Sequence, residues 1–167
     1  MNTGQRLLKI FNILLKSFGK RNWWPGETPL EIIVGAVLTQ NTSWKNVQKA
    51  IQNMKNECVL DIESLYRIGT ERLSEIIRPS GFYNLKANRL KNIVNVIYNN
   101  YGASIDNMAN ISLDELRHSL LEINGIGPET ADSILLYALN KPIFVVDAYT
   151  KRFLSNHRLH AAGGDYH

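Results

Sequence analysis

The spacing of apolar residues constrains the fold of this chain more than any other feature of its sequence. Apolar side chains recur three and four residues apart over most of the chain, which is the period of a buried helical face. Residues 143–146 form a β-branched run, and no second clear run of this kind is available to pair with it. The pattern therefore predicts an all-α protein of about eight or nine short helices, with residues 143–146 as a buried extended connector.

Local signals predict where these helices begin and end. Thr28 and Ser112 are each followed three residues later by a glutamate, which predicts two capping boxes, and Pro79-Ser80-Gly81 predicts a break. A first helix is expected to end at Gly19, with an apolar face made of Leu7, Leu8, Phe11, Leu14, Leu15 and Phe18. A long amphipathic helix over residues 84–101 is expected to turn inward Leu85, Leu90, Ile93, Val94 and Ile97.

Composition narrows the class of protein only slightly. The net charge of +4 suits a polyanionic partner but is weak evidence by itself. The single cysteine, Cys58, allows no intramolecular disulfide, and we predict it to be a small core side chain in a reducing, cytoplasmic compartment. An iron–sulfur cluster needs four cysteines, so no such cofactor is expected. His157 and His160 alone make a poor metal site, and the apolar stretch 7–15, interrupted by Lys9 and Asn12, is too short to span a membrane.

The segment 123–131 lies between two predicted helices and contains Gly125 and Gly127 around one apolar residue, Ile126. Glycines permit a tight turn with positive φ angles, and Pro128 can begin the second helix. Backbone N–H groups at the start of that helix would then point outward and could bind a phosphate. A Gly-x-Gly turn alone is common, but the longer string resembles the helix-hairpin-helix motif of DNA repair proteins.

Asp147 follows the apolar run and can cap the next helix, which would be a purely structural role. Its position twenty residues after Gly127 supports a second interpretation. Together with the hairpin and the segment 35–42, Val145-Val146-Asp147 resembles the endonuclease III superfamily of DNA glycosylases, over residues 23–159. The resemblance implies that Asp147 is catalytic, and that Gln40, otherwise an ordinary polar residue at a helix end, enters the gap left by a flipped base.

The same resemblance implies the fold and the DNA contacts. It implies a six-helix barrel-like domain over residues 28–140, with the helix-hairpin-helix at 116–139. A second helical lobe would combine residues 1–27 and 141–167. Family members usually continue beyond this point, so that lobe is expected to be incomplete at its C-terminus. The implied DNA-binding residues are Gln40, Gly125, Ile126, Gly127, Glu129 and Thr130.

Glu129 departs from the bifunctional members of this family, which have a lysine two residues after the second hairpin glycine. That amine attacks the sugar and cleaves the strand through an imine, which a carboxylate cannot form. The sequence therefore predicts a monofunctional glycosylase that activates water.

Further strings resemble the bacterial 3-methyladenine DNA glycosylases of the endonuclease III type, namely Trp23-Trp24-Pro25, residues 38–42 and Arg78-Pro79-Ser80-Gly81-Phe82-Tyr83-Asn84. By this match Trp24, Pro25 and Trp44 are the candidate base-pocket residues. Trp23 and Trp24 could instead pack beside the helix that begins near Thr28.

The expected partner is double-stranded DNA with a damaged base, bound by a monomeric enzyme of a bacterial or archaeal cytoplasm. Two other functions stay open. One is a bifunctional endonuclease III-like enzyme acting on oxidised pyrimidines, which Glu129 disfavours. The other is a non-catalytic helix-hairpin-helix DNA-binding module, which Asp147 and the aromatic loop disfavour.

Overall fold

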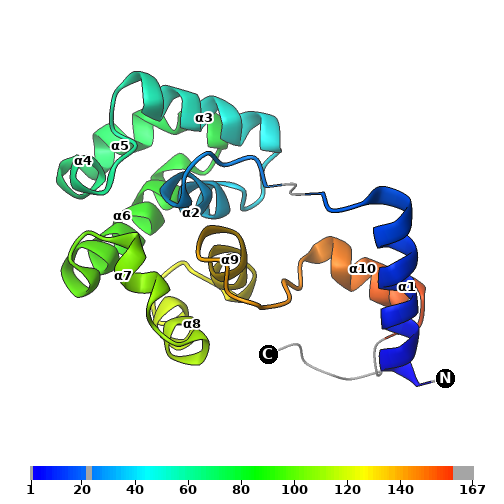
Figure 1. Ribbon diagram of the computed structural model, residues 1–167. Coiled ribbons are helices and arrows are strands. Elements are labelled where there is room, and N and C mark those ends of the chain that lie inside the picture. The colour runs from blue at the N-terminus through cyan, green and yellow to red at the C-terminus, as the bar shows by residue number, and fades with distance from the viewer. Residues whose placement is uncertain (1, 22–23, 160–167) are drawn as a thin grey trace. The chain divides into compact units, whose positions relative to one another are not determined.

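The computed structural model describes residues 2–21 and 24–159, so Trp23 and His160 lie outside the described residues (Figure 1). Within them the chain is helical and contains no strand, which confirms the all-α prediction. The helices are α1 (Thr3–Phe18), α2 (Pro29–Leu38), α3 (Trp44–Asn56), α4 (Ile62–Arg67), α5 (Thr70–Ile76), α6 (Tyr83–Tyr101), α7 (Ile105–Ala109), α8 (Leu113–Leu121), α9 (Pro128–Ser133) and α10 (Ala148–Asn156). A 3₁₀ turn, η1 (Arg78–Ser80), precedes α6, and a π-helical turn, η2 (Ile134–Ala138), continues α9.

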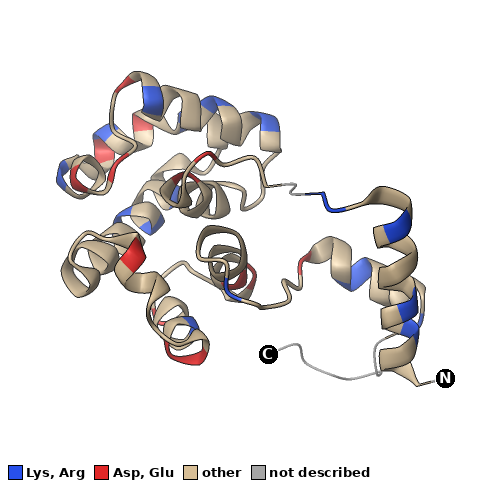
Figure 2. Ribbon diagram, in the orientation of Figure 1, with Lys and Arg blue, Asp and Glu red and all other residues tan. Residues whose placement is uncertain are grey.

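The chain forms two compact units. Unit 1 contains Met1–Pro25 and Val145–His167, and unit 2 contains Gly26–Phe144. Helices α1 and α10 therefore belong to unit 1, where Arg6 donates a hydrogen bond of 3.3 Å to the carbonyl oxygen of His157. Lysines and arginines are prominent along both of these helices (Figure 2).

Helix α1 has no buried residue, and the apolar face predicted for it is exposed. The helix begins earlier than its apolar residues indicated, because Asn2 and Gln5 form a complete capping box with bonds of 2.9 and 3.1 Å. At Thr28 and Ser112 only the first half of the predicted box exists, a bond from the Glu31 or Glu115 N–H to the hydroxyl. The Glu31 carboxylate pairs with Lys55 at 3.0 Å instead.

No described helix is both long and apolar enough to cross a membrane.

The core of unit 2 is built around α2 and α6. Helix α2 is buried along most of its length and packs against α3, α6 and η2, while α6 packs against α4 and α5. The inward face of α6 consists of Lys86, Ala87, Leu90, Ile93, Val94 and Ile97. Leu85 was predicted on this face and is 49% exposed, because Lys86 occupies the inward position at the start of the helix.

Lys86 is a charged residue inside the core, only 1% exposed. Its ammonium donates hydrogen bonds of 2.9 Å to the carbonyl of Leu38, at the end of α2, and of 2.7 Å to that of Ser80, in η1. Burial, and then the charge of Arg89, lower the pKa of Lys86 below its ordinary value. The sequence pattern could not show that a lysine would be satisfied inside the core.

Two further sequence-based predictions are wrong. Cys58 is exposed, because it lies in the turn after α3 with a left-handed backbone (φ 54°), beyond the last core residue of that helix, Met54. The connector 143–146 belongs to no helix or strand, and it is not buried as predicted, since Phe144 is 71% exposed and its neighbours are half-buried.

The turn between α8 and α9 uses its two glycines differently. Gly125 has a φ of +93°, whereas Gly127 is extended at φ −94° and ψ 176°. A Cβ atom built on Gly125 would overlap Cγ of Arg89 and lie 2.9 Å from its Cδ and Nε, but one built on Gly127 meets nothing within 4 Å. Of the two positions, only 125 therefore requires a glycine, both for its backbone conformation and because Arg89 leaves no room for a Cβ atom.

We expect Gly125→Ala to lower the free energy of unfolding by about 1–3 kcal/mol, because it combines a strained backbone with displacement of Arg89. The matched control Gly127→Ala should change it by no more than about 0.5 kcal/mol. Urea denaturation followed by circular dichroism measures both values, and equal losses in the two variants would contradict this account.

Candidate functional site

The helix-hairpin-helix consists of α8, α9 and the turn between them, and lies in unit 2. Ile123 and Ile126, in and beside its turn, are both buried. Arg117 of α8 binds the Asp132 carboxylate of α9 through both Nε (2.7 Å) and one terminal nitrogen (3.3 Å). Asp132 thereby raises the pKa of Arg117 above its ordinary value. This paired contact fixes the two helices of the hairpin relative to each other.

Gln40 lies just after α2 and joins this helix to the hairpin. Its side-chain amide donates to the Thr130 hydroxyl at 2.9 Å and to the Gly125 carbonyl at 3.4 Å. Its carbonyl oxygen accepts from the guanidinium of Arg89 in α6. The structure thus brings together Gln40, Gly125 and Thr130, three of the predicted DNA-binding residues.

Arg89 is a contact that the sequence reasoning missed. It belongs to a row on α6 in which Lys86, Arg89 and Asn92 follow one another at three-residue intervals. Lys86 donates to a carbonyl at the end of α2, and Arg89 donates to the side chain of Gln40. Asn92 donates to the carbonyl of Asn124 in the hairpin turn at 3.0 Å. The three-residue spacing was the available signal, because such residues share one side of a helix.

The outer side of the hairpin is open. Gly127 and Glu129 are exposed, while Ile126 and Thr130 are buried beneath them. Helix geometry leaves the first N–H groups of α9 without acceptors inside the helix, and Gly127, its N-cap, provides no side-chain acceptor. This part of the hairpin can therefore accept an anion, whereas the side chain at position 129 carries a carboxylate.

Asp147 is the N-cap of α10, in unit 1. Its Oδ1 accepts a hydrogen bond of 2.7 Å from the backbone N–H of Thr150, and the residue is half-buried. The capping interpretation of Asp147 is thus confirmed. The bond engages one carboxylate oxygen and fixes the orientation of the group, which is compatible with a second role.

The candidate base-pocket residues are divided between the units. Trp24 is half-buried and Pro25 is exposed, both in unit 1. Trp44 is half-buried and begins α3, in unit 2.

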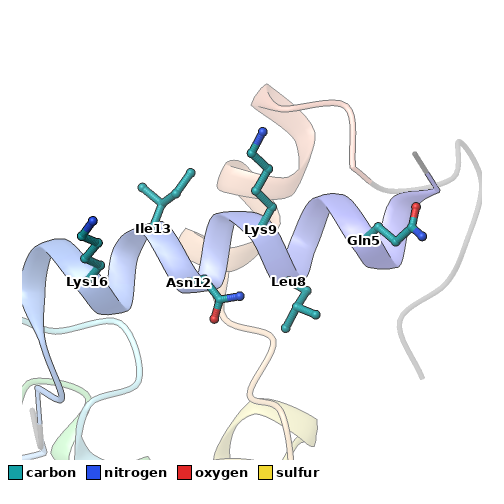
Figure 3. A pocket seen from close by; sticks show the side chains of 6 residues that line it. All are labelled: Gln5, Leu8, Lys9, Asn12, Ile13 and Lys16. Carbon is teal, nitrogen blue, oxygen red and sulfur yellow. The ribbon is translucent and has the colours of Figure 1, made fainter.

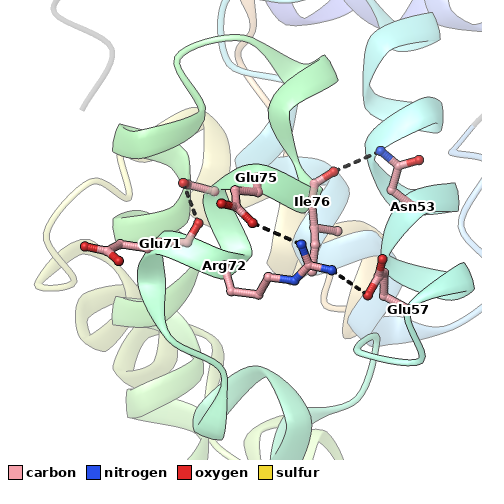
Figure 4. A network of polar contacts seen from close by, with 7 residues as sticks. Asn53, Glu57, Glu71, Arg72, Glu75 and Ile76 are labelled. Carbon is pink, nitrogen blue, oxygen red and sulfur yellow. Dashed lines mark hydrogen bonds and ion pairs between the residues drawn. The ribbon is translucent and has the colours of Figure 1, made fainter.

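Two hollows in the surface lie elsewhere. The first is lined by residues of α1 alone, which recur three and four residues apart and so share one open face of the helix (Figure 3). The second lies between α3 and α5, where Arg72 binds Glu57 at 2.8 Å and Glu75 at 3.0 Å (Figure 4). These carboxylates raise the pKa of Arg72, and the network is a set of satisfied ion pairs.

Phe82 is an exposed aromatic residue in a strained conformation. It is 68% exposed and has a left-handed backbone (φ 46°) at the start of α6. Such strain in a bulky residue is uncommon and often accompanies function. The string around Phe82 resembles that of the 3-methyladenine glycosylases but predicted no role for the residue itself.

Metal-ligating residues are dispersed in the described part of the chain. No three His, Cys, Asp or Glu side chains there lie close enough together to hold a metal ion.

Comparison with known proteins identifies the family. Residues 34–166 match the HhH-GPD superfamily of base excision DNA repair proteins. A candidate DNA repair glycosylase of Methanocaldococcus jannaschii is 54% identical over 156 residues, covering 92% of this chain and 70% of that protein. Endonuclease III of Thermotoga maritima is 30% identical over 74% of this chain, which spans about half (54%) of that enzyme's length.

A solved structure agrees with these matches. The 3-methyladenine DNA glycosylase MagIII of H. pylori, bound to 1,N6-ethenoadenine, superimposes with a TM-score of 0.82 and 34% identity, covering 99% of this chain and 77% of that chain. The helical hairpin, the aspartate after it and these similarities all indicate the same family. The chain belongs to the HhH-GPD superfamily and is a DNA repair glycosylase of the endonuclease III type.

Proposed function

We propose that this chain is a monofunctional DNA glycosylase that releases an alkylated purine such as 3-methyladenine, with Asp147 as the catalytic carboxylate. The observation that carries the proposal is Asp147 itself, held in one orientation by the N–H of Thr150 at the start of α10. The similarity to a 3-methyladenine glycosylase supports the class of substrate. The proposed partner is duplex DNA, bound by a monomer in the cytoplasm.

The reaction begins with extrusion of the damaged nucleotide, which costs a few kcal/mol. The hairpin around Gly125 and Gly127 grips the backbone through its N–H groups, which positions the protein without reading sequence. Positive charge then develops on the deoxyribose as the N-glycosidic bond breaks. The Asp147 carboxylate stabilises this charge and orients or deprotonates the attacking water.

The base itself supplies part of the driving force. Methylation makes 3-methyladenine cationic while it is attached to the sugar. It is therefore a good leaving group and needs no strong acid from the enzyme. Trp24, Pro25 and Trp44 are the proposed pocket residues. A cation over a tryptophan face gains about 0.5–2 kcal/mol, which would favour damaged over normal adenine.

Asp147→Asn should lower base release from alkylated DNA by about 10²–10⁴-fold, because a neutral amide cannot stabilise the developing charge. Asparagine caps a helix about as well as aspartate, so α10, the thermal midpoint and DNA binding should change little. Chromatography of the bases released from methylated DNA measures the loss. Undiminished release by this variant would contradict the proposed mechanism.

Glu129 leads to a separate expectation about the chemistry. The hairpin offers no amine at this position, so the protein should form no imine with DNA. Incubation with a lesion duplex and borohydride should trap no covalent complex, and strands should break only after alkali. A trapped complex would support the alternative of a bifunctional enzyme, and absence of both base release and trapping would support a binding module.

Gln40 is proposed to fill the gap left by the flipped base, and to do so it must exchange its bonds to Thr130, Gly125 and Arg89 for contacts with DNA. Gln40→Ala should therefore slow excision from a fully paired duplex several-fold. It should have less effect where the target base is already unpaired, since flipping is then less costly. Single-turnover rates on the two substrates measure the difference.

The control for this experiment is Thr130→Val, which removes one anchor of Gln40 but keeps the amide itself. It should leave the ratio of the two rates close to that of the unaltered protein. If Thr130→Val and Gln40→Ala change the rates alike, Gln40 acts through the hairpin and does not enter the gap.

A further inference from the structure

The net positive charge of this protein comes from one of its two units. Unit 1 contains eight lysines and arginines and two acidic residues, which gives a net charge of +6. Unit 2, which contains the hairpin, has eleven basic and thirteen acidic residues and a net charge of −2. The unit with the DNA-binding motif is therefore not the unit whose charge attracts a polyanion.

Ion pairing sharpens this contrast. The ion pairs that Lys55, Arg67, Arg72, Arg117 and His118 form with acidic side chains all lie in unit 2. The basic side chains of unit 1 have no carboxylate within ion-pair distance in the described part of the chain. No carboxylate of that part of the chain therefore neutralises their charge.

One of these cations lies beside the proposed catalytic group. Lys151 is exposed on α10, four residues after Asp147, and its backbone N–H bonds the Asp147 carbonyl at 3.0 Å. Residues four apart on a helix share a face and are separated by about 6 Å along the axis. Arg152, the next residue, lies over the Tyr149 ring at 5.2 Å and is engaged there.

We propose that Lys151 binds a DNA phosphate adjacent to the extruded nucleotide, so that α10 holds the backbone and the deoxyribose together. The proposal rests on the proposed role of Asp147 at that sugar. A lysine ammonium is a compact, strongly hydrated charge that contacts phosphate without demanding a fixed geometry. The hairpin then contributes directed N–H groups, and unit 1 contributes the salt-dependent attraction.

The test is the salt dependence of DNA binding. The probe is a fluorescent duplex containing a tetrahydrofuran abasic-site analogue, titrated by anisotropy between 50 and 200 mM salt. Loss of one phosphate contact reduces the steepness of the plot of log K against log salt by about 0.9. Between 50 and 200 mM salt, the affinity of Lys151→Ala should therefore fall by a factor about 3.5-fold smaller than the affinity of the unaltered protein falls. Lys151→Arg should restore the slope.

Lys49→Ala is the matched control, because Lys49 is exposed on α3 of unit 2 and the variant removes the same charge. Its slope should stay close to that of the unaltered protein. Equal slopes for Lys151→Ala and the unaltered protein, or equal losses in the two alanine variants, would overturn the proposal. Base release by the unaltered protein is read separately, so failure of the proposed function and failure of the Lys151 contact give different results.

Discussion

The buried ammonium of Lys86 connects the parts of unit 2 on which the proposed site depends. It satisfies the carbonyl oxygens of Leu38 and Ser80, which end α2 and η1, at a place where water cannot reach them. Gln40 follows Leu38 by two residues, so the position of its backbone is set from the core. Arg89 and Asn92, further along the same helix, extend this support to the Gln40 side chain and to the hairpin turn.

Much of this fold could be predicted because helix period, caps and breaks are local properties of the sequence. The all-α class and most helix boundaries followed from them. The errors arose where contacts between residues distant in the sequence decide which side chains are buried. Leu85 is exposed because Lys86 found two carbonyl acceptors in the core, and Cys58 is exposed because the turn after α3 directs it outward. No periodic pattern contains such information.

The site shows the same division between local and tertiary information. The capping bond of Asp147 was predictable from its position before a helix, and the need for a glycine at position 125 followed from the turn. The bonds of Gln40 to Thr130 and Arg89 join residues about 90 and 49 positions apart, and sequence spacing cannot specify such pairs. The resemblance to a family identified Gln40, but only the structure shows that its amide bonds Thr130 and Gly125.

The separation of charge between the units bears on how an encounter with DNA would begin. Electrostatic attraction acts over about a Debye length, roughly 8–10 Å at physiological salt, before any hydrogen bond can form. The field of a phosphate backbone would therefore pull on unit 1 and weakly repel unit 2, and the molecule would be turned while still in solution. The hairpin would make its directed contacts only after this orientation, so that arrival and precise placement would be performed by different parts of one small chain.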